Sequence, residues 1–508
     1  MIKADMDPQL ETQLVTEGVD VERMIVLLND LNAGRFESEK TGVKGSIPDI
    51  SHPSIIDRRA PAAWKMDIES ARSRFEHLGL PFSPESAGIL SSGFITFDEP
   101  SLRKIGIYLY PKTAFGLLNG GCASSYTDLK SNRALNAAAL EANRVLFTTL
   151  ARKCRGKPKG LTAAYINPDG SSGFSFLLLK LRMLLQHKKQ YQALTGLDAS
   201  GVLPAFQLTS FHTEKAIHNA FRKYIMYPEL KTLSDSLGCP AIDMYTETQS
   251  LMAAITHSSE GSPRRIFDRA RGRMNTGIPL PGGHGQNFEN LAHIYRKMYK
   301  MGIRYAWIGN IDNMGYTADP VSLAIFALSG KEAAFEESFR TSMDIKGGIL
   351  VTDETGHFTC AEIGAVLSSR DIAELEGQGK PVLFNCGIGL FDLEKLLPML
   401  PGIPQRLPHR VTDQDKAAGR YAQIEQNTWE IIGLLNDPLF LAVEKTRRFI
   451  ASKLLLETIL TSMPPDKTPS SEIAAISQVL HSGLTKLLES EYGLELVNNC
   501  WRCRFCLP

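Results

Sequence analysis

An apolar run that ends in acid and amide side chains is the first feature of this chain that could do chemistry. Residues 305–310 are largely apolar, and Ile311, Asp312 and Asn313 follow them. A buried strand leading into such residues is how open α/β sheets present ligand-binding groups at their carboxyl edge. Asp312 is therefore a candidate ligand for Mg²⁺, which prefers carboxylate oxygen. The alternative is an ordinary strand-end turn, where Asp and Asn are also common.

Two glycine-rich loops could bring backbone N–H groups close to a phosphate or a base. Asn119, Gly120 and Gly121 follow a predicted buried strand over 114–118, and His284 lies among glycines in 281–285. Glycine permits close approach of the backbone, and a helix beginning behind such a loop favours anions. Each loop could equally be a tight structural turn.

Three lysines are candidates for contact with phosphate oxygens. Lys159 lies between Pro158 and Gly160, Lys130 lies nearer the first glycine loop, and Lys453 follows a basic stretch at 447–448. An ammonium group can act as a point charge on phosphate. An exposed turn or a solvated helix face is the alternative for each.

A carboxylate and an amide could hold sugar hydroxyls. Glu362 lies in an apolar run, and Asn385 follows a predicted strand at 382–384. Both side chains suit hydroxyl groups, although either could be a cap or turn residue.

The elements that must position these residues alternate between strands and helices. Strand-like runs lie at 105–110, at 114–118, at 202–208 and from 303 onward. Helices are predicted at about 134–153 and at 287–301; one more begins near 174, and another follows 209–213 and ends near 227. This alternation predicts an α/β fold with a mostly parallel, Rossmann-like sheet flanked by helices. We expect a helical N-terminal segment (1–102), a central domain (103–428) and a small, mainly helical C-terminal region (429–508).

Composition excludes several classes of protein. The 508-residue chain has a net charge of +1, which gives no general attraction to nucleic acid or to an anionic membrane. Its first residues lack a secretory apolar region, and no apolar run approaches the roughly 18 residues of a membrane span. Five of eight cysteines are scattered, so we expect a cytoplasmic protein without a disulfide framework.

The order of the motifs adds to what each one indicates. Along the chain come Leu118-Asn119-Gly120-Gly121, Pro158-Lys159-Gly160, Thr209-Ser210-Phe211-His212-Thr213, Gln249-Ser250, Pro281-Gly282-Gly283-His284-Gly285, Asn310-Ile311-Asp312-Asn313-Met314-Gly315, Lys346-Gly347-Gly348, Glu362-Ile363, Phe384-Asn385 and Arg448-Phe449-Ile450-Ala451-Ser452-Lys453. In this order the chain resembles the UDP-sugar pyrophosphorylase family over residues 114–460, most closely its UTP–glucose-1-phosphate uridylyltransferases.

The resemblance implies a reaction between UTP and a sugar 1-phosphate that yields a UDP-sugar and pyrophosphate. By this resemblance Asp312 binds Mg²⁺, and Lys453 with Lys159 or Lys130 neutralises phosphate charge. The uridine-binding residues would be Gly120, Gly121, Gln249, Gly283 and His284. The sugar phosphate would be held by Asn313, Lys346, Glu362 and Asn385. Glucose 1-phosphate is the expected sugar, with N-acetylglucosamine 1-phosphate or a non-catalytic UDP-sugar-binding protein as alternatives.

The loop after Gly121 departs from the family pattern. It reads Cys122-Ala123-Ser124-Ser125-Tyr126, and a predicted helix at about 134–153 is inserted before Lys159. We therefore expect a rebuilt phosphate-facing loop, in which Lys130 could take over part of the role of Lys159.

Three cysteines close the sequence, at Cys500, Cys503 and Cys506. Their spacing suits zinc or an iron–sulfur cluster, but a fourth ligand is missing from the run. A mobile tail is the alternative. The sequence leaves the oligomeric state open.

Overall fold

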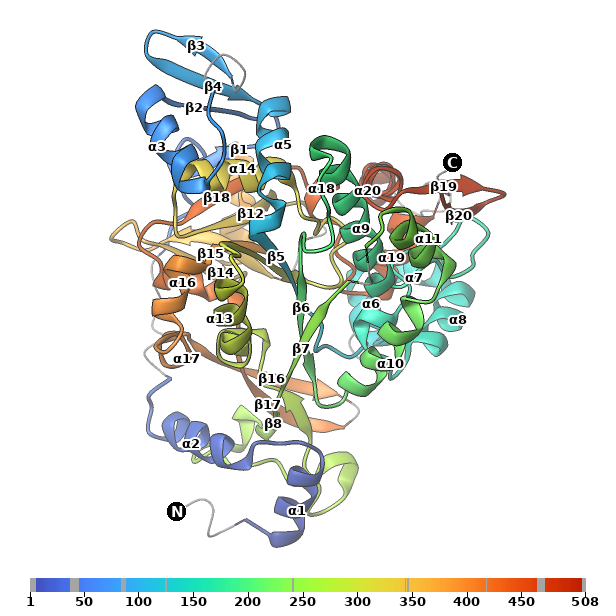
Figure 1. Ribbon diagram of the computed structural model, residues 1–508. Coiled ribbons are helices and arrows are strands. Elements are labelled where there is room, and N and C mark those ends of the chain that lie inside the picture. Colours follow the sequence, from blue (N-terminus) through green and yellow to red (C-terminus); the bar gives the residue numbers. More distant parts are fainter. Residues whose placement is uncertain are drawn as a thin grey trace.

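A ten-stranded mixed sheet forms the centre of the computed structural model (Figure 1). The structure describes residues 6–36, 45–83, 88–123, 126–239, 242–342, 344, 347–416, 418–463 and 471–504. The strands of the main path lie in the order β1-β18-β12-β15-β11-β5-β6-β7, with β13 pairing with β15 and β14 with β13.

The helices are α1 (Pro8–Thr16), α2 (Val21–Asn32), α3 (Ile68–Leu78), α5 (Glu99–Tyr108), α6 (Leu129–Leu135), α7 (Ala137–Ala142), α8 (Arg144–Cys154), α9 (Phe176–Thr195), α10 (Glu214–Tyr224), α11 (Pro228–Ser236), α12 (Asn287–Asn290), α13 (Ala292–Lys300), α14 (Pro320–Ser329), α15 (Ser369–Gly377), α16 (Leu393–Met399), α17 (Ile403–Arg406), α18 (Lys445–Arg448), α19 (Leu455–Ser462) and α20 (Ser471–Ser490). The strands are β1 (Ile55–Asp57), β2 (Ala63–Asp67), β3 (Ile89–Ser91), β4 (Phe94–Asp98), β5 (Thr113–Leu118), β6 (Ala205–Ser210), β7 (Met244–Gln249), β8 (Leu251–Ala253), β9 (Ile255–Thr256), β10 (Pro279–Pro281), β11 (Tyr305–Asn310), β12 (Ala333–Phe339), β13 (Gly348–Thr352), β14 (Phe358–Glu362), β15 (Leu383–Asp392), β16 (His409–Lys416), β17 (Gly419–Gln426), β18 (Leu439–Val443), β19 (Leu494–Val497) and β20 (Cys500–Cys503).

Most pairs in the central sheet are parallel, which confirms the predicted α/β class. Strand β11 runs parallel to β5, β5 to β6, and β6 to β7, whereas β15 is antiparallel to both β11 and β12. All six residues of β5 are buried, because helices cover both faces of the sheet. Phe115 and Trp307 face a core that includes α5, α9 and α14, and Ala306 and Ile308 face one that includes α12, α13 and α16.

The N-terminal region holds helices α1, α2 and α3, as predicted, and also strands that the sequence did not predict. Strand β1 joins the central sheet beside β18, and β2, β4 and β3 form a separate small sheet (Figure 1, top left). The run at 105–110, predicted as a strand, belongs largely to α5, whose N-cap Asp98 accepts a hydrogen bond from the Ser101 N–H. Its apolar residues lie at helical spacing on a buried face, which a short window does not distinguish from a strand.

The C-terminal region also differs from the predicted small helical unit. Strand β18 lies inside the central sheet, and β19 and β20 form a hairpin after α20. The Cys500 and Cys503 side chains therefore belong to a paired strand and not to a mobile tail, while Cys506 lies outside the described residues. Among the described residues, no three His, Cys, Asp or Glu side chains are grouped to hold a metal ion.

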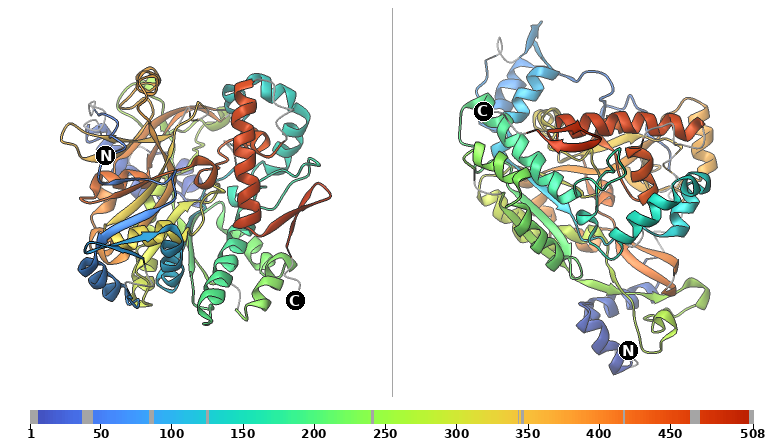
Figure 2. Two further views of the ribbon diagram at one scale, coloured as in Figure 1. Left: turned by 90° about the horizontal axis from the view of Figure 1, so that it is seen from above. Right: turned by 90° about the vertical axis from the view of Figure 1, so that its right-hand side faces the viewer.

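The helix predicted at 134–153 is broken into α6, α7 and α8. Asn136 and Asn143 lie at the breaks, and the Asn136 side chain caps α7 by accepting a hydrogen bond from the Ala139 N–H. This group packs against α19 and lies beside α20 (Figure 2).

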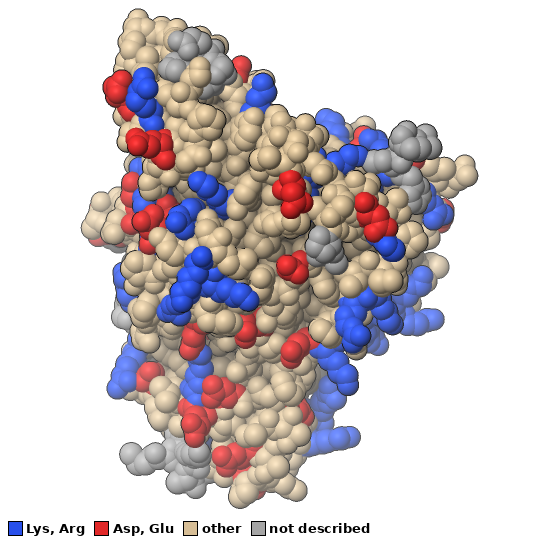
Figure 3. Space-filling view, viewed as in Figure 1, with Lys and Arg blue, Asp and Glu red and all other residues tan. Residues whose placement is uncertain are grey.

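Charge of both signs is spread over the molecular face seen in Figure 3. Of the described helices, none is long and apolar enough to cross a membrane.

Candidate functional site

The carboxyl ends of three parallel strands bring several of the predicted residues to one edge of the sheet. Gly120 and Gly121 follow β5, Asp312 follows β11, and Gln249 ends β7. Asn310 pairs with Leu118 in register, so the loops after β5 and β11 leave the sheet side by side. Polar groups delivered at this edge are the usual ligand-binding arrangement of an open α/β sheet.

The glycine loop lies against Gln249. The main-chain oxygen of Gly120 accepts a 2.7 Å hydrogen bond from Ser210 Oγ, and a Cβ at Gly120 would lie 2.8 Å from Gln249 Nε2. A Cβ at Gly121, in contrast, would meet nothing within 4 Å. Gln249 Oε1 is buried and has no hydrogen-bond partner among the described residues. An orphaned amide oxygen beside an open backbone is a suitable acceptor for a ligand N–H.

The loop after Gly121 is joined by backbone hydrogen bonds to the segment that carries Lys159. Ala123 N donates to Lys157 O at 2.9 Å, and Lys159 N donates to Gly121 O at 2.9 Å. The rebuilt loop therefore fixes the position of the lysine.

Lys159 is a buried cation next to the Asp312 loop. Its Nζ donates a hydrogen bond to the main-chain oxygen of Ser452 and lies 3.2 Å from the centroid of the Tyr126 ring. Burial lowers the pKa of the Lys159 ammonium to about 8, and the negative charge of Asp312 opposes this shift. Lys130, by contrast, is exposed on α6. The structure thus brings Lys159 to the site and leaves Lys130 on the surface.

Asp312 and Lys453 are joined through two paired loop segments. Ser452 N donates to Asp312 O at 3.1 Å, and Met314 N donates to Ile450 O at 2.8 Å. Lys453 directly follows Ser452, and its exposed side chain extends over the Phe384 ring, 5.5 Å from the centroid. Three predicted residues, Lys159, Asp312 and Lys453, therefore converge around Ser452.

The Asp312 carboxylate fits a magnesium ion held jointly with phosphates. It is only half-buried, and no described residue makes a hydrogen bond or ion pair with its side chain. Mg²⁺ at phosphate-transfer sites is commonly held by one or two carboxylates together with substrate phosphates and water. A single open carboxylate suits that arrangement better than a closed protein cage.

Asn313 is placed differently from the sugar-facing residue that was predicted. It is buried, and its Nδ2 donates to Cys386 O at 3.2 Å and to Arg448 O at 2.9 Å, while Oδ1 accepts from Gly315 N at 2.9 Å. Both N–H groups of the amide are engaged by backbone, so the side chain shapes the loop that presents Asp312.

The Gly-His-Gly loop requires glycine at position 283. Gly283 has φ +87°, and a Cβ there would lie 2.2 Å from Gln426 O. His284 Nδ1 accepts a hydrogen bond from Thr428 N at 3.1 Å, which assigns the proton of the neutral ring to Nε2. Burial lowers the pKa of His284 to about 4, and Lys453 adds to this effect. At neutral pH His284 is therefore an uncharged donor through Nε2.

Asn385 lies in a buried pair with a residue that the sequence analysis missed. Its Nδ2 donates to Glu337 Oε1 at 2.8 Å, and burial raises the pKa of Glu337 to about 8. Glu362 ends β14 half-buried, and Lys346 lies outside the described residues. Glu337 could have been suspected only from its position in the apolar strand at 333–339.

A cavity of about 420 Å³ opens beside Lys453. Its walls come from α6, the β16–β17 hairpin, α19 and α20, and include Lys416, Lys445, Lys453, Phe384, Phe449 and Leu480. Its volume is within the roughly 300–1,000 Å³ of small-molecule sites. Lys445 is paired with Asp344, which leaves Lys416 and Lys453 as the more available cations.

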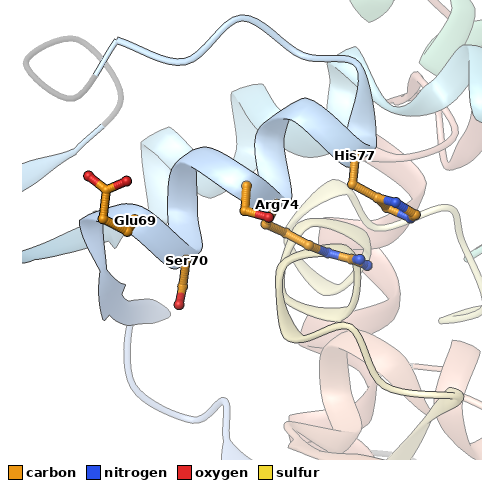
Figure 4. A pocket seen from close by; sticks show the side chains of 5 residues that line it. Glu69, Ser70, Arg74 and His77 are labelled. Carbon is orange, nitrogen blue, oxygen red and sulfur yellow. The ribbon is translucent and has the colours of Figure 1, made fainter.

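A further hollow lies along α3 (Figure 4). Glu69, Ser70, Ser73, Arg74 and His77 line it, all from one helix. It brings no separate chain segments together.

The family of the chain follows from comparison with known proteins. Residues 171–460, more than half of the chain, match the family model described as UTP–glucose-1-phosphate uridylyltransferase. The chain belongs to this family. The match begins after Lys159, so the placement of Gly120, Gly121 and Lys159 rests on their geometry.

A Schizosaccharomyces pombe protein named "Probable UTP–glucose-1-phosphate uridylyltransferase" is 26% identical over 250 residues, 49% of this chain and 42% of that protein. The chain thus spans less than half the length of this curated relative.

Two solved Trypanosoma brucei structures share the fold. One is a UDP-N-acetylglucosamine pyrophosphorylase in complex with an inhibitor (TM-score 0.57, 16% identity, 90% of this chain, 76% of that one). The other is described as a UDP-glucose phosphorylase (TM-score 0.52, 18% identity, 96% and 79%).

Proposed function

We propose that this protein is a uridylyltransferase that makes UDP-glucose and pyrophosphate from UTP and glucose 1-phosphate. The observation that carries the proposal is the convergence of Lys159, Asp312 and Lys453 around Ser452, beside the glycine loop. An open carboxylate at the carboxyl edge of an α/β sheet, with one lysine bonded to the paired segment and a second lysine next along it, suits the transfer of a nucleotidyl group.

The reaction needs positioning and charge neutralisation more than proton transfer. A phosphate oxygen of the sugar phosphate attacks the α-phosphorus of UTP, and the bond to the bridging oxygen of the β-phosphate breaks, releasing pyrophosphate. The attacking group is already an anion, so no general base is required. Lys159 and Lys453 stabilise the charge that develops on the phosphates. Magnesium, when bound at Asp312, would supply further charge neutralisation to the phosphates.

The nucleotide has a separate set of contacts in this proposal. Gly121 leaves room for the backbone to approach UTP, and Gln249 Oε1 offers an acceptor to the base. His284 offers its Nε2–H donor from the opposite loop. We propose Glu362, Asn385 and the cavity beside Lys453 for the sugar side, with the Asn385 amide held by Glu337 and Gly387.

N-acetylglucosamine 1-phosphate is the second candidate substrate. The fold is shared with a UDP-N-acetylglucosamine pyrophosphorylase, and the cavity beside Lys453 has the apolar side chains Leu135, Leu454 and Leu480 in its wall. An acetamido methyl group would find apolar contacts there, whereas a glucose hydroxyl would not.

One experiment separates the candidates. Pyrophosphate release is measured with UTP, Mg²⁺ and each sugar 1-phosphate in turn. The proposal expects release with glucose 1-phosphate at a higher kcat/KM than with N-acetylglucosamine 1-phosphate, and the opposite ranking selects the second candidate. Tight UDP-sugar binding without release from any sugar phosphate would identify a non-catalytic binding protein.

A further inference from the structure

A fully buried lysine grips the loop that carries Asp312. Lys180 is 0% exposed in α9, and its Nζ donates to Asn313 O at 2.7 Å and to Tyr316 O at 2.6 Å. No described carboxylate lies within ion-pair distance of this ammonium group. A buried cation without an acidic partner is costly, and here main-chain oxygens of one loop satisfy it.

The third donor of Lys180 reaches the C-terminal region. Nζ lies 3.1 Å from the Tyr492 hydroxyl, which itself donates to Met314 O at 2.6 Å. The oxygens of Asn313, Met314 and Tyr316 are thus bound from one side by two buried side chains, which we name the Lys180–Tyr492 clamp.

The clamp is anchored by the same helix. Arg182 Nε donates to Tyr492 O at 2.6 Å, and its Nη2 donates to Gly493 O at 3.0 Å. The turn at Gly493 has φ +61°, and a Cβ there would lie 2.2 Å from Gln186 Nε2. Helix α9 therefore fixes the turn that presents the Tyr492 hydroxyl to the Asp312 loop.

We propose that Lys180 and Tyr492 are positioning residues for Asp312, and that they set the affinity of the site for divalent metal. Only the part of this proposal that concerns metal affinity rests on the proposed function. The other side of the loop is held by backbone pairing with residues 450–452, so the clamp and that pairing together fix the backbone on both sides of Asp312. Groups that orient a metal ligand typically change metal affinity or activity by about 10- to 100-fold when they are removed.

The same helix supplies a matched control. Lys188 is also buried, and its Nζ donates to Ser200 O at 2.8 Å. It lies two helical turns, about 12 Å, from Lys180 along α9 and does not contact the Asp312 loop. Lys180→Met and Lys188→Met each remove one buried ammonium group, so a general loss of stability affects both.

The test combines metal binding, kinetics and hydrogen exchange. Mn²⁺ binding in the presence of UTP is followed by electron paramagnetic resonance, and the rate of pyrophosphate release is titrated with Mg²⁺. We expect Lys180→Met to weaken Mn²⁺ binding and raise the half-saturating Mg²⁺ concentration by about 10- to 100-fold, with the KM for UTP within about twofold at saturating metal. Lys188→Met should keep the wild-type Mn²⁺ affinity and the wild-type half-saturating Mg²⁺ concentration. The same Mn²⁺ affinity and the same half-saturating Mg²⁺ concentration in the two variants would overturn the proposal.

Hydrogen exchange tests the clamp without substrate or metal. We expect amides at 311–316 to exchange faster in Lys180→Met than in Lys188→Met, and Tyr492→Phe to show the same change with a smaller amplitude. Tyr492→Phe loses one hydroxyl and keeps its ring, so it remains informative if Lys180→Met does not fold. Unchanged exchange in Tyr492→Phe with wild-type metal affinity would exclude a positioning role. A wild-type protein that releases no pyrophosphate refutes the proposed function while the exchange result still decides the clamp.

Discussion

The Asp312 side chain is the residue on which the proposed chemistry depends most. Its carboxylate is half-buried, and no described group binds it, while Asn313 and Ser452 fix its backbone. We expect Asp312→Asn to lower kcat by about 10²–10³, as for loss of one charge that stabilises a transition state. Because the change is isosteric, the unfolding temperature should stay near wild type. Near-full turnover with Mg²⁺ would exclude Asp312 as the metal ligand.

Lys159 should impose an alkaline limit on activity. Its pKa of about 8 means that the charged form is lost as the pH rises through that value. We therefore expect kcat/KM to fall above about pH 8, and Lys159→Met to lose most activity at pH 7, whereas exposed Lys130→Met keeps it. The pH profile of kcat/KM reports the free enzyme.

Stability should move in the opposite direction over this range. The unfolded chain keeps its Lys159 proton up to about 10.5, so it binds more protons than the native state between about 8 and 10.5, and this group favours the native state increasingly as pH rises. An alkaline loss of activity with a simultaneous loss of native structure would contradict the assignment.

Gly121 and Gly120 differ in what a methyl group would meet. At Gly121 it meets nothing in the protein within 4 Å, but at Gly120 it meets Gln249. We expect Gly121→Ala to fold normally and to raise the KM for UTP, because its methyl group enters ligand space. Thermal unfolding and UTP titration measure the two effects separately. Wild-type affinity in Gly121→Ala would place the nucleotide elsewhere.

At the scale of elements, the pairing of β12 with β15 contains an acid that is neutral in the native state. Glu337 and Asn385 face each other in register, and the pKa of Glu337 rises from 4.5 to about 8 on burial. The native state holds this proton when the unfolded chain has lost it, so the stability that the group contributes is complete below pH 4.5 and is lost as the pH rises to about 8.

Glu337→Gln should remove that dependence. We expect a flatter profile of unfolding free energy against pH, with the variant gaining on wild type by about 1.4 kcal/mol per pH unit at most between 4.5 and 8. Denaturant unfolding of both proteins at pH 5, 6.5 and 8 measures the two free energies of unfolding. Parallel profiles for the two proteins would show that Glu337 is ionised in the native state.

Continuous apolar strands were the elements that the sequence predicted best. The strand at 114–118 and the run from 303 lie in β5 and β11, because fully buried parallel strands read as unbroken apolar segments. Edge strands gave no such signal. Strand β1 has three residues, and β2 alternates exposed with half-buried residues.

The sequence predicted which residues belong to the candidate site, but it did not predict the hydrogen bonds that hold its loops. The motifs placed Asp312, His284 and Gln249 near one another, whereas the hydrogen bonds of Asn313, Glu337 and Lys180 join segments far apart in the chain. Lys180 lies in a run of leucines at 177–185, and only the three-dimensional structure shows why a charge is placed there.

At the scale of the whole molecule, the N-terminal helices pack against the segment that follows Gln249, a residue that we propose binds the nucleotide. Asp20 N donates to Leu251 O at 2.9 Å and Leu251 N to Gly18 O at 3.0 Å, two residues beyond Gln249. Helices α1 and α2 also pack against Met252 and Ile424 in one apolar cluster (Figure 1, bottom).

Removal of residues 1–36 should therefore impair UTP binding more than sugar phosphate binding. We expect a several-fold higher KM for UTP and a more aggregation-prone protein, because the apolar cluster becomes exposed. The point variant Val19→Pro, which removes the Val19 N–H donor to Leu14 O between the two residues that bond to Leu251, serves as the milder comparison. An unchanged KM for UTP in both would show that this region supports folding only.

The pairing of β1 with β18 has a consequence for how the protein is made. Strand β1 ends at Asp57, and its partner begins at Leu439. At about 5–20 residues per second, the ribosome takes roughly 20–80 s to reach the second strand after the first has emerged. During that interval the edge of β1 has no partner, and the central sheet cannot close. We therefore expect nascent chains of this protein to engage chaperones until late in translation, with protease resistance of the N-terminal region arising only after residue 443 leaves the exit tunnel.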